Sequence, residues 1–294
     1  MTIEQSRDEM SHPVTGIDHC FLLVQDLDRS LEQFQRLGFT VSPRGLHSAR
    51  KGTANHTIML SADDYFELLG VVAETEDNAP RRALLARDGE GLHAMACRIT
   101  DAHDAKARLD ALEISTGAVS SFERPLSLPD GSEGVAAFSA LSFAGHEVPV
   151  GLAFMCQHHT RDMVWRPELM RHENGAIALA GAVAVVGDPE RAARRYARLF
   201  ADGSVASRDG GFVVQTGSIP ITFLAPQALA SRHPGLDIAR TPKNAFAILQ
   251  IEVDNLDKPR NILERNGIDI HETASSVCVY AEAASGVAIE FIAR

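Results

Sequence analysis

The stretch from Gly16 to Phe39 reads GIDHCFLLVQDLDRSLEQFQRLGF, and its pattern is the starting point for predicting the fold. Its apolar run to about Val24 predicts a strand, and an acidic residue at Asp26 or Asp28 can cap a following helix. The apolar face of that helix is spaced four, three and three residues apart, at Leu27, Leu31, Phe34 and Leu37. Gly38 is a helix stop, so the stretch predicts one strand followed by one amphipathic helix.

The same plan of one strand and one helix returns three times, in the ranges 91–114, 180–200 and 246–268. Three further strand-like segments follow each helix, and turn signals such as Pro129-Asp130-Gly131 and Asp209-Gly210-Gly211 separate them. Self-similarity of this kind indicates a repeated structural unit. The unit is strand–helix–strand–strand–strand, and its four copies predict an α+β fold.

A single βαβββ unit is a small sheet with a helix on one face, so the other face of the sheet needs a partner. Two units side by side can form a curved sheet around a shared cleft. We therefore expect four βαβββ modules paired into two domains, which span residues 14–160 and 175–294. The segment 158–174 is the expected linker, and residues 226–242 are expected to form a longer loop in the second half.

The composition excludes several classes of protein. Of the 294 residues, 45% are apolar, and the formal net charge of −11 disfavours binding to nucleic acid or to an anionic membrane. The four cysteines form no CxxC pair, which favours reduced thiols in a cytoplasmic protein. Residues 1–13 lack the apolar core of a signal peptide, and the longest apolar run, 176–186, is too short to span a bilayer.

Several short motifs point to a known family. They are Gly16-Ile17-Asp18-His19, Ser42-Pro43-Arg44-Gly45, Gly52-Thr53-Ala54-Asn55, Tyr65-Phe66-Glu67-Leu68, Leu128-Pro129-Asp130-Gly131 and Cys156-Gln157-His158-His159-Thr160. Together with the repeat, they resemble the vicinal oxygen chelate superfamily, which includes glyoxalase I, extradiol dioxygenases, and fosfomycin and bleomycin resistance proteins. More narrowly, they resemble its bacterial glyoxalase-like domain branch. The motifs cover about residues 16–175, and the two expected domains would both be glyoxalase-like.

The resemblance implies one divalent metal ion, held by ligands on the first and last strands of paired modules. The corresponding residues here are His19, His93 and Glu67, while the place of a fourth ligand falls in the stretch 150–154, VGLAF, which has none. Two imidazoles and one carboxylate leave coordination positions open, which suits iron, manganese, zinc or nickel. A four-ligand glyoxalase I site is therefore not expected.

Each of these residues also has a purely structural interpretation. A lone histidine in a strand is more often packed than bound to a metal, but a carboxylate such as Glu67 among apolar neighbours is costly unless it is paired or metal-bound. The second half has Gly181 and Ile248 near the histidine places, so we expect that half to be metal-free. Glu290 would then be an inert relic or a salt-bridge partner.

The candidate substrate-binding residues are Arg44, Arg124 and His47. Each arginine follows the helix of its module, and two guanidinium groups near a metal can hold an anionic or enolate substrate. His56 is the candidate acid or base beside Glu67, because an imidazole exchanges protons near neutral pH. The two arginines and the two histidines could instead face solvent. His158 is expected in the linker.

The sequence thus predicts a metal-dependent glyoxalase-like lyase or isomerase that acts on a small oxygen-rich substrate, which could be anionic. The open ligand set makes an extradiol-type ring-cleaving dioxygenase the first alternative. A metal-free binding or resistance protein, which would sequester a small molecule in the cleft, is the second. A third view makes the second half a structural cover or dimerisation element. The substrate, the metal and the oligomeric state stay open, with a homodimer as one option.

Overall fold

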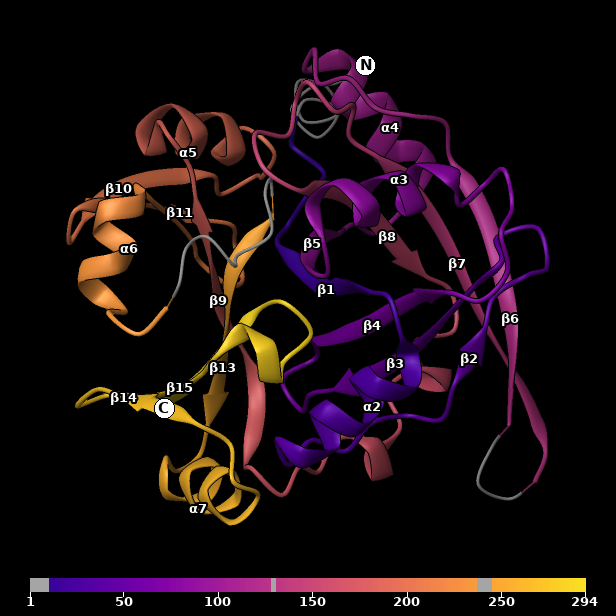
Figure 1. Ribbon diagram of the computed structural model, residues 1–294. Coiled ribbons are helices and arrows are strands. Elements are labelled where there is room, and N and C mark those ends of the chain that lie inside the picture. The colour runs from indigo at the N-terminus through magenta and orange to yellow at the C-terminus, as the bar shows by residue number, and fades with distance from the viewer. Residues whose placement is uncertain (1–10, 128–130, 237–244) are drawn as a thin grey trace.

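The computed structural model describes residues 11–127, 131–236 and 245–294. Within these ranges the fold is mixed α+β, as predicted (Figure 1). The elements up to residue 158 are β1 (Ile17–Val24), α2 (Leu27–Arg36), β2 (Gly45–Leu46), β3 (Thr53–Met59), β4 (Tyr65–Val71), α3 (Ala79–Asp88), β5 (Gly91–Arg98), α4 (Ala102–Ala111), β6 (Ser120–Ser127), β7 (Glu133–Ser142) and β8 (Leu152–His158).

The later elements are η1 (Arg161–Met163), η2 (Pro167–Leu169), β9 (Ala176–Val185), α5 (Pro189–Ala197), β10 (Ser204–Arg208), β11 (Gly211–Gln215), β12 (Ile221–Leu224), α6 (Pro226–Arg232), β13 (Phe246–Val253), α7 (Asp257–Arg265), β14 (Ile270–Glu272), β15 (Ser276–Val279), η4 (Ala281–Ala283) and β16 (Ala288–Ala293). Those from β9 onward occupy the left and centre of Figure 1, in reddish brown to yellow.

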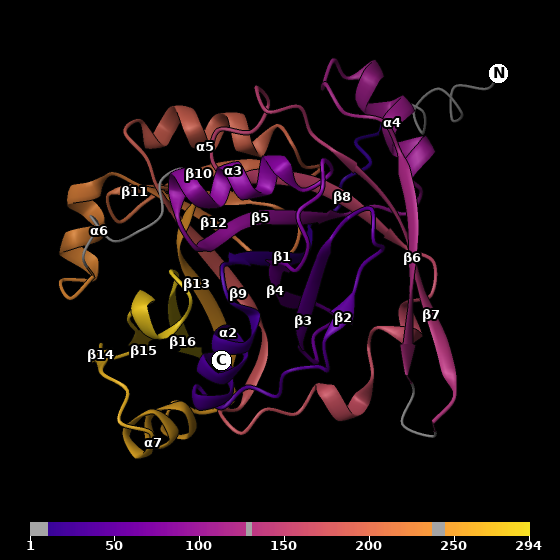
Figure 2. The same ribbon diagram turned by 45° about the vertical axis from the view of Figure 1, so that its right-hand side comes forward.

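One strand-pairing pattern recurs along the chain. β1 pairs in parallel with β4, β4 pairs antiparallel with β3, and β3 with β2. The strands β5–β8–β7–β6 repeat this order, as do β9–β12–β11–β10 and β13–β16–β15–β14. Antiparallel pairing joins β1 to β5 and β9 to β13, so two curved halves form within one 16-stranded sheet of the described residues (Figure 2). Phe246 pairs with Leu92 and links the two halves of the sheet.

Helix α2 shows why the predicted strand–helix plan holds. The side chain of Asp26 accepts hydrogen bonds from the backbone N–H groups of Asp28 and Arg29, which caps the helix start. Leu27 and Phe34 are buried against the sheet. Gly38 follows the helix end with φ of +87°, a conformation that glycine adopts without strain.

Three segments differ from the expectation. Helix α3 has no counterpart in the sequence prediction, and helix α6 occupies the start of the stretch expected to be a loop. Both helices carry a proline in the first turn, and α6 has only seven residues, so their sequences resemble turns. The expected linker contains η1 and η2, and its Val164 and Trp165 pack against Tyr65 and Phe138 of the first half. Residues 237–244 of the expected loop and the motif positions 128–130 lie outside the described residues.

The two halves share one hydrophobic core. A single cluster of buried side chains includes Leu22 and Met95 from the first half and Leu249 and Phe291 from the second. Polar contacts reinforce it, because the Asp64 carboxylate accepts a hydrogen bond from the Leu179 backbone N–H at 3.0 Å. The halves are therefore packed as one body. Among the described residues, no helix combines the length and apolar character needed to cross a lipid bilayer.

Candidate active site

A cavity of about 380 Å³ lies inside the first half, between β1, β3, β4, α3 and the strands β6 to β8. This volume is within the range of small-molecule sites, which is about 300–1,000 Å³. Strand alternation selects the residues of β3 that reach it. Thr53, Asn55 and Thr57 line the cavity, whereas Ala54 and Ile58 belong to the hydrophobic core on the other face.

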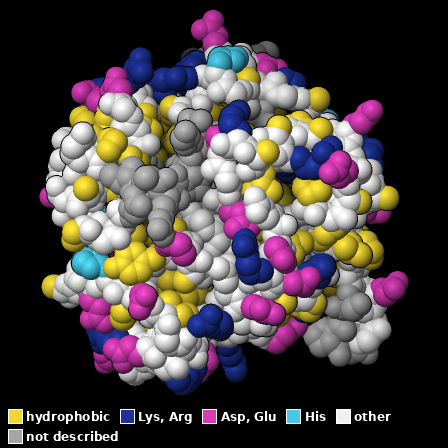
Figure 3. Space-filling view, viewed as in Figure 1, with side chains coloured by type: hydrophobic (Ala, Val, Ile, Leu, Met, Phe, Trp, Pro, Cys, Tyr) yellow, Lys and Arg dark blue, Asp and Glu magenta, His cyan; other side chains and the backbone are white. Residues whose placement is uncertain are grey.

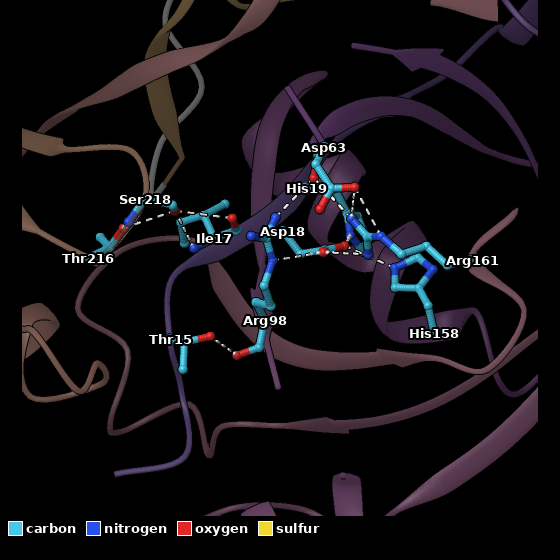
Figure 4. A network of polar contacts seen from close by, with 10 residues as sticks. All are labelled: Thr15, Ile17, Asp18, His19, Asp63, Arg98, His158, Arg161, Thr216 and Ser218. Atoms are coloured by element: carbon cyan, nitrogen blue, oxygen red, sulfur yellow. Dashed lines mark hydrogen bonds and ion pairs between the residues drawn. The ribbon is translucent and has the colours of Figure 1, made fainter. Parts of the chain in front are cut away.

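Asp18 and His19 form a buried pair at one wall of this cavity (Figure 4). The strand register shifts between the pairs Ile17–Cys97 and His19–Ala96, so Asp18 is an extra residue in β1 and forms a β-bulge. The bulge explains why two neighbours along a strand contact each other instead of pointing apart. The carboxylate oxygen Oδ2 of Asp18 lies 2.9 Å from Nδ1 of His19.

Asp18 is the centre of a larger polar network. His158 Nε2 donates to the same Oδ2 atom at 2.9 Å, and Arg98 and Arg161 reach Oδ1 at 3.3 and 3.4 Å. Burial would raise the pKa of Asp18, but the hydrogen bonds from His158 and His19 outweigh it and hold the pKa well below its usual range. Burial lowers the pKa of His158, which therefore donates as a neutral imidazole at pH 7. Asp18 is thus a fixed carboxylate anion.

The other edge of His19 faces the cavity. Its ring stacks on Tyr65 with centroids 4.3 Å apart, and it lies edge-on to Phe154 at 5.7 Å. These three residues line the cavity, whereas Asp18 and His158 are not among the described residues that do so. Because the Asp18 carboxylate accepts a hydrogen bond from Nδ1, Nε2 is the ring nitrogen left for a molecule in the cavity. This arrangement suits a general base.

Glu67 supplies a carboxylate to the same cavity. It lies opposite Phe21 in the parallel pair of β1 and β4, two residues beyond the pair of His19 and Tyr65. The amide nitrogen of Asn55 donates a hydrogen bond to Glu67 Oε2. His19 and Glu67 are therefore brought to one wall, as the sequence suggested.

His93 is not brought to that wall, which corrects its expected position. The register of β1 and β5 shifts between the pairs Phe21–Ala94 and Leu22–Leu92, so His93 is the extra residue of a second bulge. Its Nε2 donates to the carbonyl oxygen of Gly89 at 2.7 Å, and the residue is fully buried. A bulge changes which face a side chain occupies, and single-strand alternation could not anticipate it.

His56 and Arg44 also lie outside the cavity. His56 sits between the cavity-lining Asn55 and Thr57 of β3, so alternation turns it to the opposite face, where its Nδ1 donates to the Ser42 carbonyl at 2.8 Å. Arg44 forms an ion pair at 2.5 Å with the exposed Asp28. Neither residue is placed to act on a molecule in the cavity.

His47 and Arg124 do line the cavity. His47 Nδ1 lies 2.8 Å from the Thr53 hydroxyl, and burial lowers its pKa to about 4, so the imidazole is neutral at pH 7. Arg124 packs against Gly45, where an added Cβ would lie 2.6 Å from its Nη1. The absence of a side chain at position 45 thus gives the guanidinium its space.

Lys51 and Arg81 line the cavity too, although neither was predicted from the sequence. Lys51 Nζ lies 3.1 Å from the ring centroid of Phe122, and burial, with the nearby Arg81, lowers the pKa of the lysine to about 8. Arg81 comes from α3, the helix that was not predicted. Lys51 lies between two predicted strands, so only its position near the cavity motifs could have indicated it.

Metal binding can be tested against the donors present. Asp18, His19 and His158 are the described residues whose ligand atoms converge, within 4.8 Å of one another, and two imidazoles with a carboxylate suit a borderline divalent ion. Arg98 and Arg161 already reach Oδ1, however, and Nδ1 of His19 is engaged with Asp18, which is not among the described residues that line the cavity. The donors therefore fit a buried ion in kind, but they do not fit an open ion that chelates a substrate in the cavity.

Comparisons with known proteins agree with the fold. A family model described as a glyoxalase-like domain matches residues 17–200. No curated protein sequence matches the chain. A solved structure of a hypothetical protein from Staphylococcus aureus aligns with a TM-score of 0.66 at 12% identity, over 95% of this chain and 99% of that one.

Two further solved structures carry descriptive names. A xylose isomerase-like TIM barrel/4-hydroxyphenylpyruvate dioxygenase fusion protein aligns with a TM-score of 0.60 at 12% identity, over 97% of this chain and 49% of that one. A mutant 4-hydroxymandelate synthase from Streptomyces coelicolor aligns with a TM-score of 0.55 at 13% identity, over 96% of this chain and 93% of that one. At such identities the likeness shows the fold and carries no reaction with it.

Proposed function

Because this chain belongs to the glyoxalase-like domain family, we propose that it is a lyase or isomerase of glyoxalase-like type. Its substrate would be a small oxygen-rich anion that binds in the cavity of the first half. The observation that carries this proposal is the Asp18–His19 pair, whose free imidazole edge opens onto that cavity. The Asp–His arrangement prepares a base for proton transfer.

In the proposed reaction, Nε2 of His19 takes a proton from a carbon next to a carbonyl group. The electron pair of the broken C–H bond moves into an enolate, and the proton returns to the same carbon. If that carbon carries a hydroxyl group, the intermediate is an enediolate: the hydroxyl proton moves to the former carbonyl oxygen, a new carbonyl forms at the first carbon, and the C–H proton returns to the former carbonyl carbon. Asp18 stays ionised and stabilises the imidazolium that forms on His19. Glu67, on the same wall, is the second group able to accept or return a proton.

The arrangement of the donors gives little support to one expectation, namely that a divalent ion chelates the substrate, whether that ion is iron, manganese, zinc or nickel. Of the converging donors, Asp18 and His158 lie behind the cavity wall, and His19 is the member that lines the cavity. We therefore derive no step through a metal. A buried ion at those donors would compete with the hydrogen bonds that Asp18 already accepts.

The test is exchange of a substrate C–H proton with deuterated water. The probes are small 2-oxo and 2-hydroxy acids such as phenylpyruvate, followed by NMR with the wild type, the His19→Gln variant and an enzyme-free blank. We expect exchange that survives chelating agents and falls at least about 100-fold in the variant, the usual scale for loss of a general base. Exchange that disappears on metal removal and returns with an added ion would overturn the metal-free step. Turnover that consumes oxygen would favour the dioxygenase.

A second candidate is a metal-free protein that binds a small molecule without converting it. The aromatic lining favours it, because Phe122, Phe138 and Phe154 offer a large apolar contact surface to a ligand. Tight binding without exchange or turnover, unchanged in His19→Gln, would support this alternative.

The domain organisation is also a proposal. We interpret the recurring strand order as four βαβββ modules paired into two glyoxalase-like domains, residues 14–160 and 175–294. The proposed partner is the small-molecule substrate, and a homodimer stays a prediction. Size-exclusion chromatography with light scattering tests that last point.

A further inference from the structure

We propose that the cavity selects substrates carrying a carboxylate or phosphate group, bound by Lys51, Arg81 and Arg124, together with an apolar or aromatic body. This inference rests on the proposed function in so far as the same cavity is the reaction site. It assigns to these three side chains, here called the cation cluster, the role of orienting the substrate towards His19.

The cation cluster lacks the partners that neighbouring cations have. Arg44 pairs with Asp28, Arg50 with Asp77 and Arg82 with Glu74. In contrast, none of the three members of the cation cluster forms an ion pair with a carboxylate of the described residues. They come from the loop after β2, from α3 and from β6, yet all three line one cavity.

The charge inside the cavity is therefore positive. His47 interacts electrostatically with all three members of the cluster and with Glu67, so these five groups lie near one another. His47 is neutral at pH 7, since its pKa is lowered to about 4 by burial. Glu67 is the carboxylate among them, and it already accepts a hydrogen bond from Asn55.

This local excess is unusual in a chain with a formal net charge of −11. On the face shown in Figure 3, acidic and basic side chains are interspersed, and no broad basic patch covers it. Two carboxylates lie nearby, Glu67 and Asp77, and Asp77 is already paired with Arg50. Three cations that are partly removed from water therefore still gain free energy when an anion enters. Guanidinium groups match the paired oxygens of carboxylate and phosphate, and a lysine adds a point charge.

The rest of the cavity selects the body of the ligand. Phe122 and Phe138 stack with centroids 5.3 Å apart, and Lys51 lies over the Phe122 ring. Phe154 and Tyr65 continue this apolar wall to His19. A molecule with an anionic end at the cation cluster would place its apolar body along these rings, and its reacting carbon near the imidazole.

Calorimetric titration of the intact protein tests the inference. The probes are 3-phenylpropanoate, its neutral counterpart 3-phenylpropanol, phenyl phosphate and inorganic phosphate. We expect both aromatic anions to bind at least about tenfold more tightly than the alcohol, with the difference shrinking at high salt. The relative affinities of 3-phenylpropanoate and phenyl phosphate identify the preferred anion. Equal affinity for anion and alcohol would overturn the proposal.

Variants separate this binding role from general electrostatics and from catalysis. Lys51→Met and Arg124→Met should each weaken anion binding about tenfold or more, whereas Arg194→Met, in an exposed ion pair on α5, should not change it. Anion binding by the wild type should also weaken above about pH 8, where Lys51 loses its proton. His19→Gln should keep the anion affinity even if it abolishes exchange, so failure of the reaction and failure of this inference are distinguishable. Anion affinity that both methionine variants retain would overturn the role of the cluster.

Discussion

The two halves of the molecule use the same strand order, but a polar cavity opens beside β1 and β4 of the first half, whereas α6 packs against the corresponding strands β9 and β12 of the second. In both halves an extra helix follows the fourth strand along the chain. Helix α3 follows β4 in the first half, and α6 follows β12 in the second. Helix α3 leaves about 380 Å³ of space and contributes Arg81 to its lining. Helix α6 instead inserts Leu229 into an apolar cluster with Val183, Ile248 and Ala288.

The carboxylates of the two halves show the same contrast. Glu67 on β4 lies in the cavity wall beside His19 and accepts a hydrogen bond from Asn55. Glu290 on β16 is buried and bonds to Gln250 at 2.8 Å, directly across the strand pair. An equivalent strand position thus carries either a cavity carboxylate or an internally satisfied one. The inserted helix, more than the sheet, decides whether a cleft can receive a ligand.

The largest expected effect follows from cutting the halves apart. A chain that ends at residue 175 would lose β9 and β13 and expose the core side chains that now pack against them. We expect this truncated chain to be insoluble or to lack a cooperative thermal transition, because exposed apolar surface drives aggregation. Circular dichroism and sedimentation of the purified fragment measure it. A folded, soluble and active fragment would contradict the shared core and would make the second half a removable cover.

Removing the central carboxylate of the first half should have the next largest effect. Asp18→Ala would leave Arg98 and Arg161 without this anion and two imidazoles without their acceptor. Loss of one partner of a buried pair typically costs about 3–5 kcal/mol of unfolding free energy. Urea unfolding measures this cost. The Asp18→Asn variant should retain more stability than Asp18→Ala. It should still lose proton exchange, because the proton on His19 Nδ1 is no longer fixed. Exchange as fast as in the wild type would exclude Asp18 as the positioning residue.

The inserted helices give a smaller and more local comparison. Leu229→Ala in α6 should destabilise the protein by roughly 2–5 kcal/mol, because this fully buried side chain leaves a cavity behind. Leu84→Ala in α3 should cost less, since that side chain is only partly buried. Urea unfolding measures the loss of unfolding free energy in each variant, and the two variants form a matched pair. Equal costs would mean that α3 packs as tightly as α6 and would weaken the contrast between an open and a filled cleft.

Much of the fold and part of the site could be predicted from local sequence patterns. The spacing of Leu27, Leu31 and Phe34 and the acidic cap sufficed for α2, and the repeat extended that prediction along the chain. His19 and Glu67 reach one wall because strand alternation holds over most of β1 and β4. The same alternation, applied to β3, would have turned His56 away from the cavity.

The remaining site residues depend on features that no local pattern shows. Asp18 and His93 are bulge residues, and a bulge is defined by the register of two strands that are distant in sequence. His158 reaches Asp18 only because β8 lies beside β5. Its position in the sequence, near the expected linker, therefore did not indicate this contact. Arg81 depends on α3, whose proline-initiated sequence lacks an apolar helical face.

The smallest expected effect concerns Asp64, which ties the first half to β9. Burial raises its pKa to about 7, although the hydrogen bond from the Leu179 N–H opposes the shift. For this carboxyl the folded state prefers the protonated form. The stability it contributes is therefore complete below the ordinary pKa of 3.8 and is lost as pH rises through about 7.

An Asp64→Asn variant keeps an oxygen that can accept from Leu179 but cannot ionise. The difference in unfolding free energy between variant and wild type should therefore move in favour of the variant from pH 4 to pH 8 and level off above it. Urea titrations across this range measure the difference. The exposed Asp209→Asn is the control, and its difference should stay flat. A flat profile for Asp64→Asn as well would show that this carboxyl ionises freely, so that the junction between the halves is more hydrated than its burial implies.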